Sequence, residues 1–328
     1  MATYDCGMAQ SGPGLLLQHL EKADDPSIEA GIAVIRRLDA DVLLLTGFDY
    51  DYDGAALSAL QSRLSGLGLT YPEALALRPN GGIPTGLDLD HDGALGGPRD
   101  AQGYGHFAGQ GGMAILSRYP IDREGIRDFS ALLWQDLPGA DLPPDMTEEA
   151  KAIQRLSTSG HYEVPVVYAP GKTFRLLAFS ATPPVFDGPE DRNGRRNSDE
   201  AALWLRLLDG ALPQAPPAAP FVVIGEPGLD PKDGEGKPAS LLSLMARLQD
   251  PQPRGTSGRQ EPGQRGDPAL DTDLLKSGQG LRLDMILPSK DIAVTGAGVQ
   301  WPADSDPFAA TLAAASSHRP VWIRLALP

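Results

Sequence analysis

The sequence predicts an α/β protein in which short buried strands alternate with amphipathic helices. Its apolar runs are short and rich in β-branched residues, and the segments between them repeat apolar residues at helical spacing. A hydrophobic content of 41% over 328 residues allows a packed core. Strands are expected at 41–45, 112–117, 164–168, 174–179, 221–225, 281–287 and 321–325.

Helices are expected at about 13–22, 27–38, 54–65, 195–210 and 239–248. The second shows the clearest pattern, because Ile28, Ile32 and Ile35 recur on one face. The fourth places Leu203 and Leu207 in the same way. Each helix is therefore expected to pack one apolar face against a sheet.

Long polar loops account for much of the high content of glycine (38) and proline (31). They are expected at about 78–111, 183–197 and 250–280. In the second loop, Arg192, Arg195 and Arg196 are expected to pair with acidic neighbours at the surface. Because no repeat or change of composition marks a boundary, we expect residues 1–328 to form a single domain.

The charge balance limits the classes of partner. The chain has 28 basic and 43 acidic residues and a net charge of −15, whereas nucleic-acid binding relies on basic side chains that neutralise phosphates. We therefore expect a protein partner, whose identity the sequence leaves open, rather than nucleic acid. Cys6 is the only cysteine, which excludes an intrachain disulfide.

The expected location follows from two features. No apolar run approaches the roughly 18 residues that span a membrane. No basic and apolar leader follows Met1. We expect a cytoplasmic protein unless a signal peptide has been removed.

The segment 88–93 resembles the start of a calcium-binding loop. Asp88, Asp90 and Asp92 alternate, and Gly93 allows a sharp turn. Carboxylate oxygens on a tight loop suit Ca²⁺, although the flanking helices and distal glutamate of an EF-hand are missing. The alternative is a solvated acidic turn.

Two residues near the C-terminus suggest acid–base chemistry. Asp284 lies in the apolar run 281–287, where a carboxylate is costly to bury unless it is paired. His318 precedes the last expected strand. An aspartate that orients a histidine is a common catalytic arrangement, but the sequence alone leaves open whether these two meet.

The order of these segments resembles the endonuclease/exonuclease/phosphatase family, which includes deoxyribonuclease-I-like enzymes. The resemblance spans nearly the whole chain, and the segments 86–93 and 182–197 further resemble a bacterial subgroup whose members can be exported. It implies a four-layer αββα sandwich with two mixed β-sheets inside. The landmarks are 2–5, 41–45, 112–120, 222–225, 281–284 and 317–319.

Active members of the family hydrolyse phosphodiesters or phosphomonoesters with Mg²⁺, so the resemblance implies a carboxylate for the metal, an Asp–His pair, and side chains that orient water and phosphate. Asp284 and His318 match the pair, and His161 matches a phosphate-facing position as a vestigial catalytic residue. Asp5 stands in place of an asparagine, and Glu226 in place of an aspartate.

Other family positions are lost. Gly47 stands where the metal-binding glutamate is expected, and Ser180 stands where a histidine is expected. Gly228 replaces an asparagine, and Ser317 replaces the aspartate before His318. Because such groups act as a unit, their combined loss predicts a degenerate active site.

Three readings follow. The first is a catalytically inactive pseudoenzyme that acts as a binding or assembly subunit. The second is a metal-dependent phosphoesterase with a rebuilt carboxylate site, in which Asp5, Glu226 and Asp284 hold Mg²⁺, with help from Asp49 or Asp230. The third is a calcium-stabilised extracellular protein without an active-site role, and it is compatible with the first.

Overall fold

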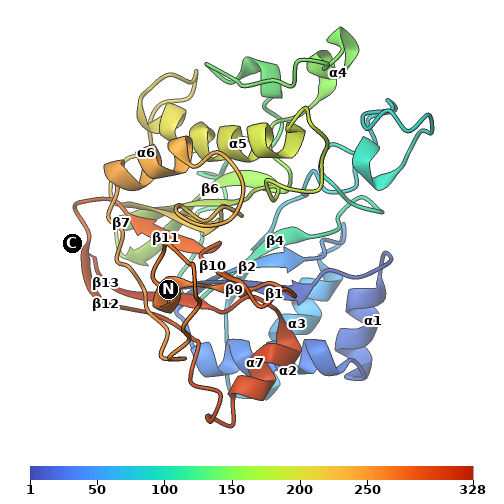
Figure 1. Ribbon diagram of the computed structural model, residues 1–328. Helices are drawn as coiled ribbons and strands as arrows, with labels where there is room; N and C mark the ends of the chain where they lie inside the picture. Colours follow the sequence, from blue (N-terminus) through green and yellow to red (C-terminus); the bar gives the residue numbers. More distant parts are fainter. Residues whose placement is uncertain (328) are drawn as a thin grey trace.

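Two β-sheets form the centre of the computed structural model, which describes residues 1–327 (Figure 1). The larger sheet has six strands, and its order is β12-β13-β1-β2-β4-β3. Its central strands β1 and β2 run parallel, and the other neighbours are antiparallel. In chain order these strands are β1 (Ala2–Met8), β2 (Val42–Phe48), β3 (Glu73–Ala76), β4 (Gly112–Ser117), β12 (Ala293–Val299) and β13 (Val321–Ala326).

The smaller sheet has five strands in the order β11-β8-β7-β6-β5. Here β7 and β8 are the parallel pair. Its strands are β5 (Arg127–Asp128), β6 (Gly160–Ala169), β7 (Lys172–Ser180), β8 (Phe221–Glu226) and β11 (Met285–Pro288). Two further short strands, β9 (Asp273–Leu274) and β10 (Gly280–Leu281), form a separate hairpin.

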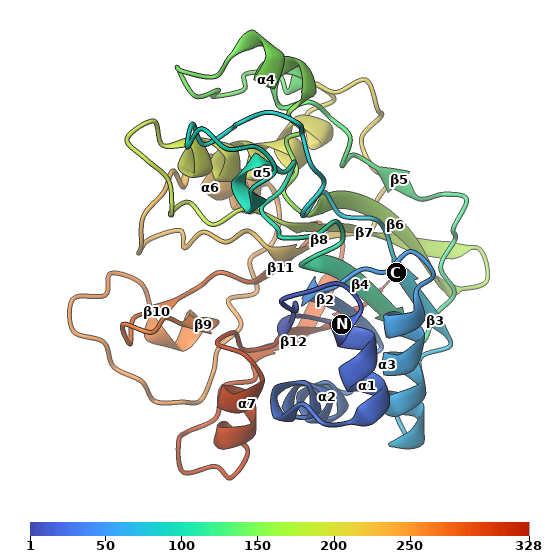
Figure 2. The same cartoon turned by 90° about the vertical axis from the view of Figure 1, so that its right-hand side faces the viewer.

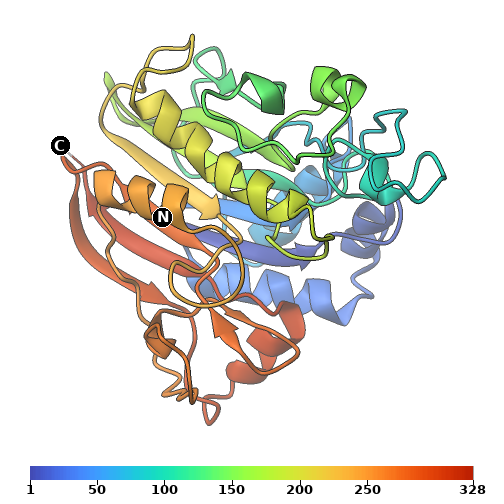
Figure 3. The same ribbon diagram turned by 45° about the horizontal axis from the view of Figure 1, so that its top comes forward.

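Helices cover the outer faces of both sheets, which confirms the predicted four-layer sandwich (Figures 1 and 2). The larger sheet is covered by α1 (Leu15–Lys22), α2 (Pro26–Leu38), α3 (Ala55–Gly66) and α7 (Ala309–Ala315). The smaller sheet is covered by α5 (Arg192–Leu208) and α6 (Ala239–Arg247), which lie side by side in Figure 3. The short α4 (Glu148–Ile153) lies in the connection before β6. Among the described residues, no helix is long and apolar enough to cross a membrane.

The core explains why the central strands read as continuous apolar runs. Side chains alternate along a strand, so Val42 and Leu44 of β2 pack between the sheets, while Leu43 and Leu45 pack under the helices. A strand buried on both faces loses the alternating pattern of a half-exposed strand. All the expected strands and helices are present at these positions, with one strand interrupted.

The expected strand 281–287 is that exception. It is broken between β10 and β11, because the chain changes partner there from β9 to β8. The amide groups at the break bond to side chains instead: Arg282 N donates to Asp230 at 2.7 Å, and Asp284 N donates to the Thr272 hydroxyl at 3.0 Å. Asp284 therefore lies in the short connection between two strands rather than inside one.

The prediction for the loop 183–197 was also partly wrong, because α5 already begins at Arg192. The Arg196 guanidinium is buried and donates to the Leu156 carbonyl at 2.8 Å, and Arg192 donates to the Leu89 carbonyl. Arg195 pairs with Asp141 outside the loop. These arginines tie α5 to neighbouring segments, in place of the expected surface pairs.

Candidate functional site

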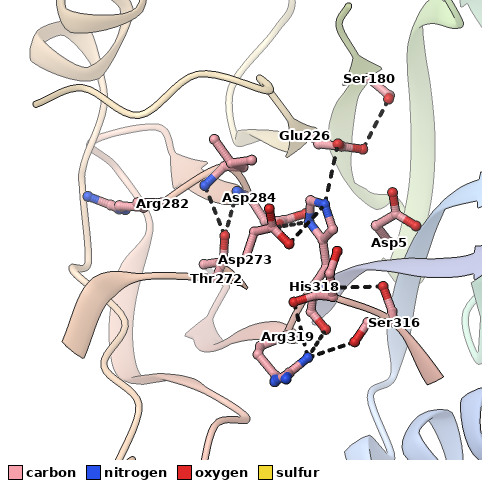
Figure 4. Close-up of polar contacts among 12 residues, drawn as sticks. Asp5, Ser180, Glu226, Thr272, Asp273, Arg282, Asp284, Ser316, His318 and Arg319 are labelled. Carbon is pink, nitrogen blue, oxygen red and sulfur yellow. Dashed lines mark hydrogen bonds and ion pairs between the residues drawn. The ribbon is translucent and has the colours of Figure 1, made fainter. Parts of the chain in front are cut away.

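Asp284 and His318 meet in the structure. The fully buried Asp284 accepts a hydrogen bond on Oδ2 from His318 Nδ1 at 2.8 Å (Figure 4). Asp284 lies between β10 and β11, and His318 lies between α7 and β13. Since Nδ1 bonds to the carboxylate, Nε2 is the ring nitrogen left to face the site.

Two further predicted residues join this pair. Asp5 is on β1 of the larger sheet, and Glu226 is the last residue of β8 of the smaller sheet, so the site lies where the two sheets meet. Ligand atoms of Asp5, Glu226 and His318 all lie within 4.8 Å of one another. Glu226 Oε1 is 3.9 Å from His318 Nε2. We call these residues, with Asp284, the acidic cluster.

The protonation of the acidic cluster reflects burial and crowding of negative charge. Burial, followed by the neighbouring Asp5 carboxylate, raises the pKa of Glu226 to about 8. Burial lowers the pKa of His318, but Asp284, Asp5 and Glu226 outweigh that effect and raise the pKa well above its ordinary value. Excess negative charge in the cluster is thus balanced by protons when no cation is bound.

The donor set also fits a divalent cation. Carboxylate oxygens from Asp5 and Glu226, with one imidazole nitrogen, are ligands that such ions take in proteins. Within the part of the chain that is described, the buried Oδ1 of Asp284 has no hydrogen-bond partner. The Glu226 and His318 side chains are 17% and 12% exposed, so solvent has access to the cluster.

Gly47 explains the position of Asp5. Gly47 has φ +62°, a conformation that favours glycine, and a Cβ atom built there would overlap the Asp5 carboxylate. The Asp5 side chain therefore occupies the space beside β2 into which the first atoms of a longer residue 47 would extend. Where the family resemblance implies a carboxylate at position 47, the structure places the carboxylate of Asp5 from β1 beside Gly47.

The other substituted positions contribute little hydrogen-bond capacity. The Ser180 hydroxyl donates to Glu226 Oε2 at 3.3 Å, and it is a weak and short donor compared with a histidine. Gly228 has no side chain, and the nearby Asn197 amide donates to the Thr182 and Pro227 carbonyls. Ser317 is exposed.

His161 lies outside the acidic cluster. Its ring is buried against Phe179 and Trp204, with ring centroids 5.1 and 5.2 Å away. Nδ1 bonds to the Ser157 hydroxyl at 2.7 Å, and Nε2 bonds to the Glu200 carbonyl at 2.9 Å. Burial lowers the pKa of His161 to about 3. Both nitrogens thus bond to groups inside the core, and His161 is not grouped with the ligand atoms of Asp5, Glu226 and His318.

Asp49 and Asp230 also have other roles. Asp49 accepts hydrogen bonds from the amides of Gln10 at 2.8 Å and Gly111 at 2.9 Å. Asp230 accepts them from three backbone amides, including that of Arg282. Both carboxylates hold loops in place rather than joining the acidic cluster.

The predicted calcium loop contains a different third carboxylate. Ligand atoms of Asp88, Asp90 and Asp100 lie within 4.8 Å of one another, whereas Asp92 accepts from the Ala94 amide at 2.7 Å. Asp100 is buried and accepts from the Leu89 and Gly97 amides. The spacing of residues along the sequence did not identify Asp100, because the loop must fold back to bring Asp100 beside Asp88 and Asp90. Calcium binding remains a prediction.

Comparisons with known proteins agree with this architecture. The model of the Endonuclease/Exonuclease/phosphatase family matches residues 22–225, which is more than half of the chain. A search of curated proteins finds no match.

Solved structures of low sequence identity share the fold. An endonuclease/exonuclease/phosphatase from Beutenbergia cavernae has a TM-score of 0.55 at 19% identity over 99% of this chain and 70% of that one. An endonuclease/exonuclease/phosphatase from Bacteroides vulgatus has a TM-score of 0.53 at 13% identity, over 100% of this chain and 98% of that one. Sphingomyelinase C from Streptomyces griseocarneus has a TM-score of 0.51 at 14% identity, over 98% of this chain and 96% of that one. With the family match, they lead to one conclusion: this chain belongs to the endonuclease/exonuclease/phosphatase family.

Proposed function

We propose that this chain binds a divalent cation at the acidic cluster, does not turn over phosphoesters, and acts as a binding or assembly subunit. The observation that carries the proposal is the chemical make-up of the cluster. Asp5, Glu226 and Asp284 are acceptors when ionised, and His318, which bonds to Asp284 through Nδ1, offers the site only its Nε2 atom. Ser180 and Gly228 stand where the family resemblance implies donors for phosphate.

Charge supports a preference for cations over phosphate. A phosphate group brought against ionised carboxylates is repelled unless positive groups offset them, and the effect is strong where water is largely excluded. The two arginines nearest in sequence to Asp284 and His318 bond to other groups. Arg282 pairs with Asp250 at 2.6 and 2.8 Å, and Arg319 donates to the Ser316, Ser317 and His318 carbonyls.

A bound divalent cation would offset part of the carboxylate charge and polarise a phosphoryl oxygen. Hydrolysis needs more than this, because donors must also hold the phosphate and stabilise the charge that develops. Losing one such donor typically costs about 100- to 1,000-fold in rate. The losses at Ser180 and Gly228 therefore support an inactive site even with a cation present.

The test is hydrolysis of bis(p-nitrophenyl) phosphate and p-nitrophenyl phosphate with Mg²⁺, Mn²⁺ or Ca²⁺. We expect the wild type and Asp284→Ala to give the same background rate. Turnover well above background that Asp284→Ala abolishes would overturn the proposal. Anisotropy of a labelled DNA oligonucleotide at low salt should show no binding, because the net charge of −15 opposes it.

A second candidate is a phosphoesterase with a rebuilt carboxylate site. The hydrogen bond between Asp284 and His318 favours it, since the arrangement keeps the imidazole oriented for acid–base work. In this case His318 Nε2 would donate a proton to the leaving oxygen. The assay above separates the two candidates, because only this one predicts a rate that depends on Asp284.

A further inference from the structure

We propose that Asp273, supplied by the loop 250–280, is an additional ligand of the cation at the acidic cluster. The inference rests on the cation-binding part of the proposed function. Asp273 lies on β9, and its side chain is 4% exposed. Its Oδ1 atom is 3.7 Å from His318 Nε2, close to the 3.9 Å that separates Glu226 Oε1 from the same nitrogen. Figure 4 shows Asp273 and Glu226 approaching the imidazole from different elements.

Asp273 Oδ1 is buried and has no hydrogen-bond partner among residues 1–327. A carboxylate oxygen in this state has lost its water without gaining a donor, which is costly unless a counter-charge is present. The nearest counter-charge is His318, whose Nδ1 atom bonds to Asp284 and whose Nε2 atom lies 3.7 Å from Asp273 Oδ1, beyond hydrogen-bond distance. A cation held by Asp5, Glu226 and His318, whose ligand atoms lie within 4.8 Å of one another, would supply the missing partner on the Nε2 side of His318, which Asp273 faces.

The backbone holds Asp273 in this position. Its neighbours bond to the strand segments on both sides: the Thr272 amide donates to the Leu281 carbonyl at 2.8 Å, and the Leu274 amide donates to the Ser317 carbonyl at 3.2 Å. The Arg319 amide donates to the Thr272 carbonyl at 2.6 Å. Asp273 and His318 thus form an antiparallel bridge, which fixes one side chain relative to the other.

Thr272 also ties this segment to Asp284. Its hydroxyl accepts from the Leu283 amide at 2.9 Å and from the Asp284 amide at 3.0 Å. The two carboxylates that flank His318 are therefore positioned by the same short segment. A ligand set held in this way loses little freedom on binding a cation, which favours affinity.

The rest of the loop is anchored at Trp301. The guanidinium of Arg259 lies over the indole at 5.3 Å from the ring centroid, and that of Arg319 lies over it at 4.9 Å. The Thr256 amide donates to the Trp301 carbonyl at 2.8 Å. These contacts join the loop to the segment after β12. Asp273 is therefore part of a fixed wall of the site rather than the tip of a free loop.

The test is calorimetric titration of the full chain with MnCl₂ and MgCl₂. Asp273→Asn keeps the size of the side chain and removes its charge. We expect it to weaken cation affinity at least about tenfold. Asp271→Asn is a matched control, because Asp271 lies in the same segment and also has a buried carboxylate oxygen, Oδ2, without a hydrogen-bond partner among the described residues, but it is not one of the residues that pair with His318. We expect it to change affinity less than about twofold.

A second readout separates a ligand from a structural residue. Without metal, Asp273→Asn should melt at the same temperature as the wild type or higher, because it removes a buried carboxylate that lacks a hydrogen-bond donor and lies beside the carboxylates of the acidic cluster. With MnCl₂, its melting temperature should rise less than that of the wild type. A large drop in melting temperature without metal would instead mean that Asp273 stabilises the fold, and would overturn the inference.

The remaining outcomes distinguish the two proposals. If the double variant Asp5→Asn with Glu226→Gln abolishes binding while Asp273→Asn binds normally, Asp273 is not a ligand and the cation site stands. Equal weakening by Asp271→Asn and Asp273→Asn would also overturn the inference. If the wild type binds neither metal, the cation-binding part of the proposed function fails as well.

Discussion

Replacing His161 with glutamine tests whether this residue is part of the core. A glutamine amide can still donate to the Glu200 carbonyl and accept from the Ser157 hydroxyl, the two bonds made by the imidazole. It cannot take up a proton. The loss of ring packing against Phe179 and Trp204 lowers stability at every pH alike. The comparison of two pH values therefore isolates the titration of His161.

The expected magnitude follows from the pKa of His161, which falls from 6.5 in the unfolded chain to about 3 in the fold. A lowered pKa in the fold gives stability that is complete above pH 6.5 and is lost as the pH falls, because the unfolded state then binds a proton that the folded state does not. At 1.36 kcal/mol per pH unit, lowering the pH from 7.5 to 5.0 should cost about 2 kcal/mol.

The assay is urea unfolding at pH 7.5 and pH 5.0, followed by tryptophan fluorescence. The wild type should lose about 2 kcal/mol more than His161→Gln between these pH values. Burial raises the pKa of Glu200 to about 7, so this group titrates in the same range with the opposite sign in both proteins. The difference of about 2 kcal/mol between proteins with His161 and with His161→Gln should therefore persist when both also carry Glu200→Gln. Equal losses in the two proteins would refute the description of His161 as a sequestered, neutral side chain.

Three further predictions test other parts of the structure. Chelation with EGTA should lower the melting temperature of the wild type and of Asp92→Ala but not that of Asp90→Ala, because Asp90, unlike Asp92, lies in the cluster with Asp88 and Asp100. Gly47→Ala should cost more than about 2 kcal/mol of unfolding free energy in the wild type but only about 1 kcal/mol beside Asp5→Ala, where the positive φ alone remains. Arg196→Met should cost about 3 kcal/mol in urea unfolding, because buried carbonyls lose their donor; a cost below 1 kcal/mol would contradict this assignment.

The sequence predicted most central strands and the long helices because their own residues specify them, whereas β1 was indicated only by the landmark 2–5 of the family resemblance. It missed β12, whose residues 293–299 include Gly296 and Gly298 and have no apolar alternation. Both glycines face the indole of Trp322 on β13, and a Cβ at Gly298 would lie 2.8 Å from that ring. This strand is thus determined by a partner on another strand, which local propensity does not register.

The candidate site could be predicted only in part for a similar reason. The family resemblance selected Asp284 and His318, and the fold brings them to 2.8 Å from positions 34 residues apart. Asp273 carries no such signal, because it lies on a two-residue strand in a polar loop. Asp100 reaches Asp88 only through the path of its loop. Contacts of this kind depend on where loops return, and spacing along the sequence does not determine them.

Compared with the residues that the family resemblance implies, the site differs more in which positions carry a carboxylate than in whether carboxylates are present. Gly47 and Ser317 carry no carboxylate, but Asp5 fills the space beside Gly47, and Asp273 lies against the residue that follows Ser317. Ser180 and Gly228 stand where the family resemblance implies donors for phosphate. A cation needs the first kind of group, and a phosphate ester needs both. The two properties can therefore separate, and this is the basis on which we propose cation binding without hydrolysis for this chain.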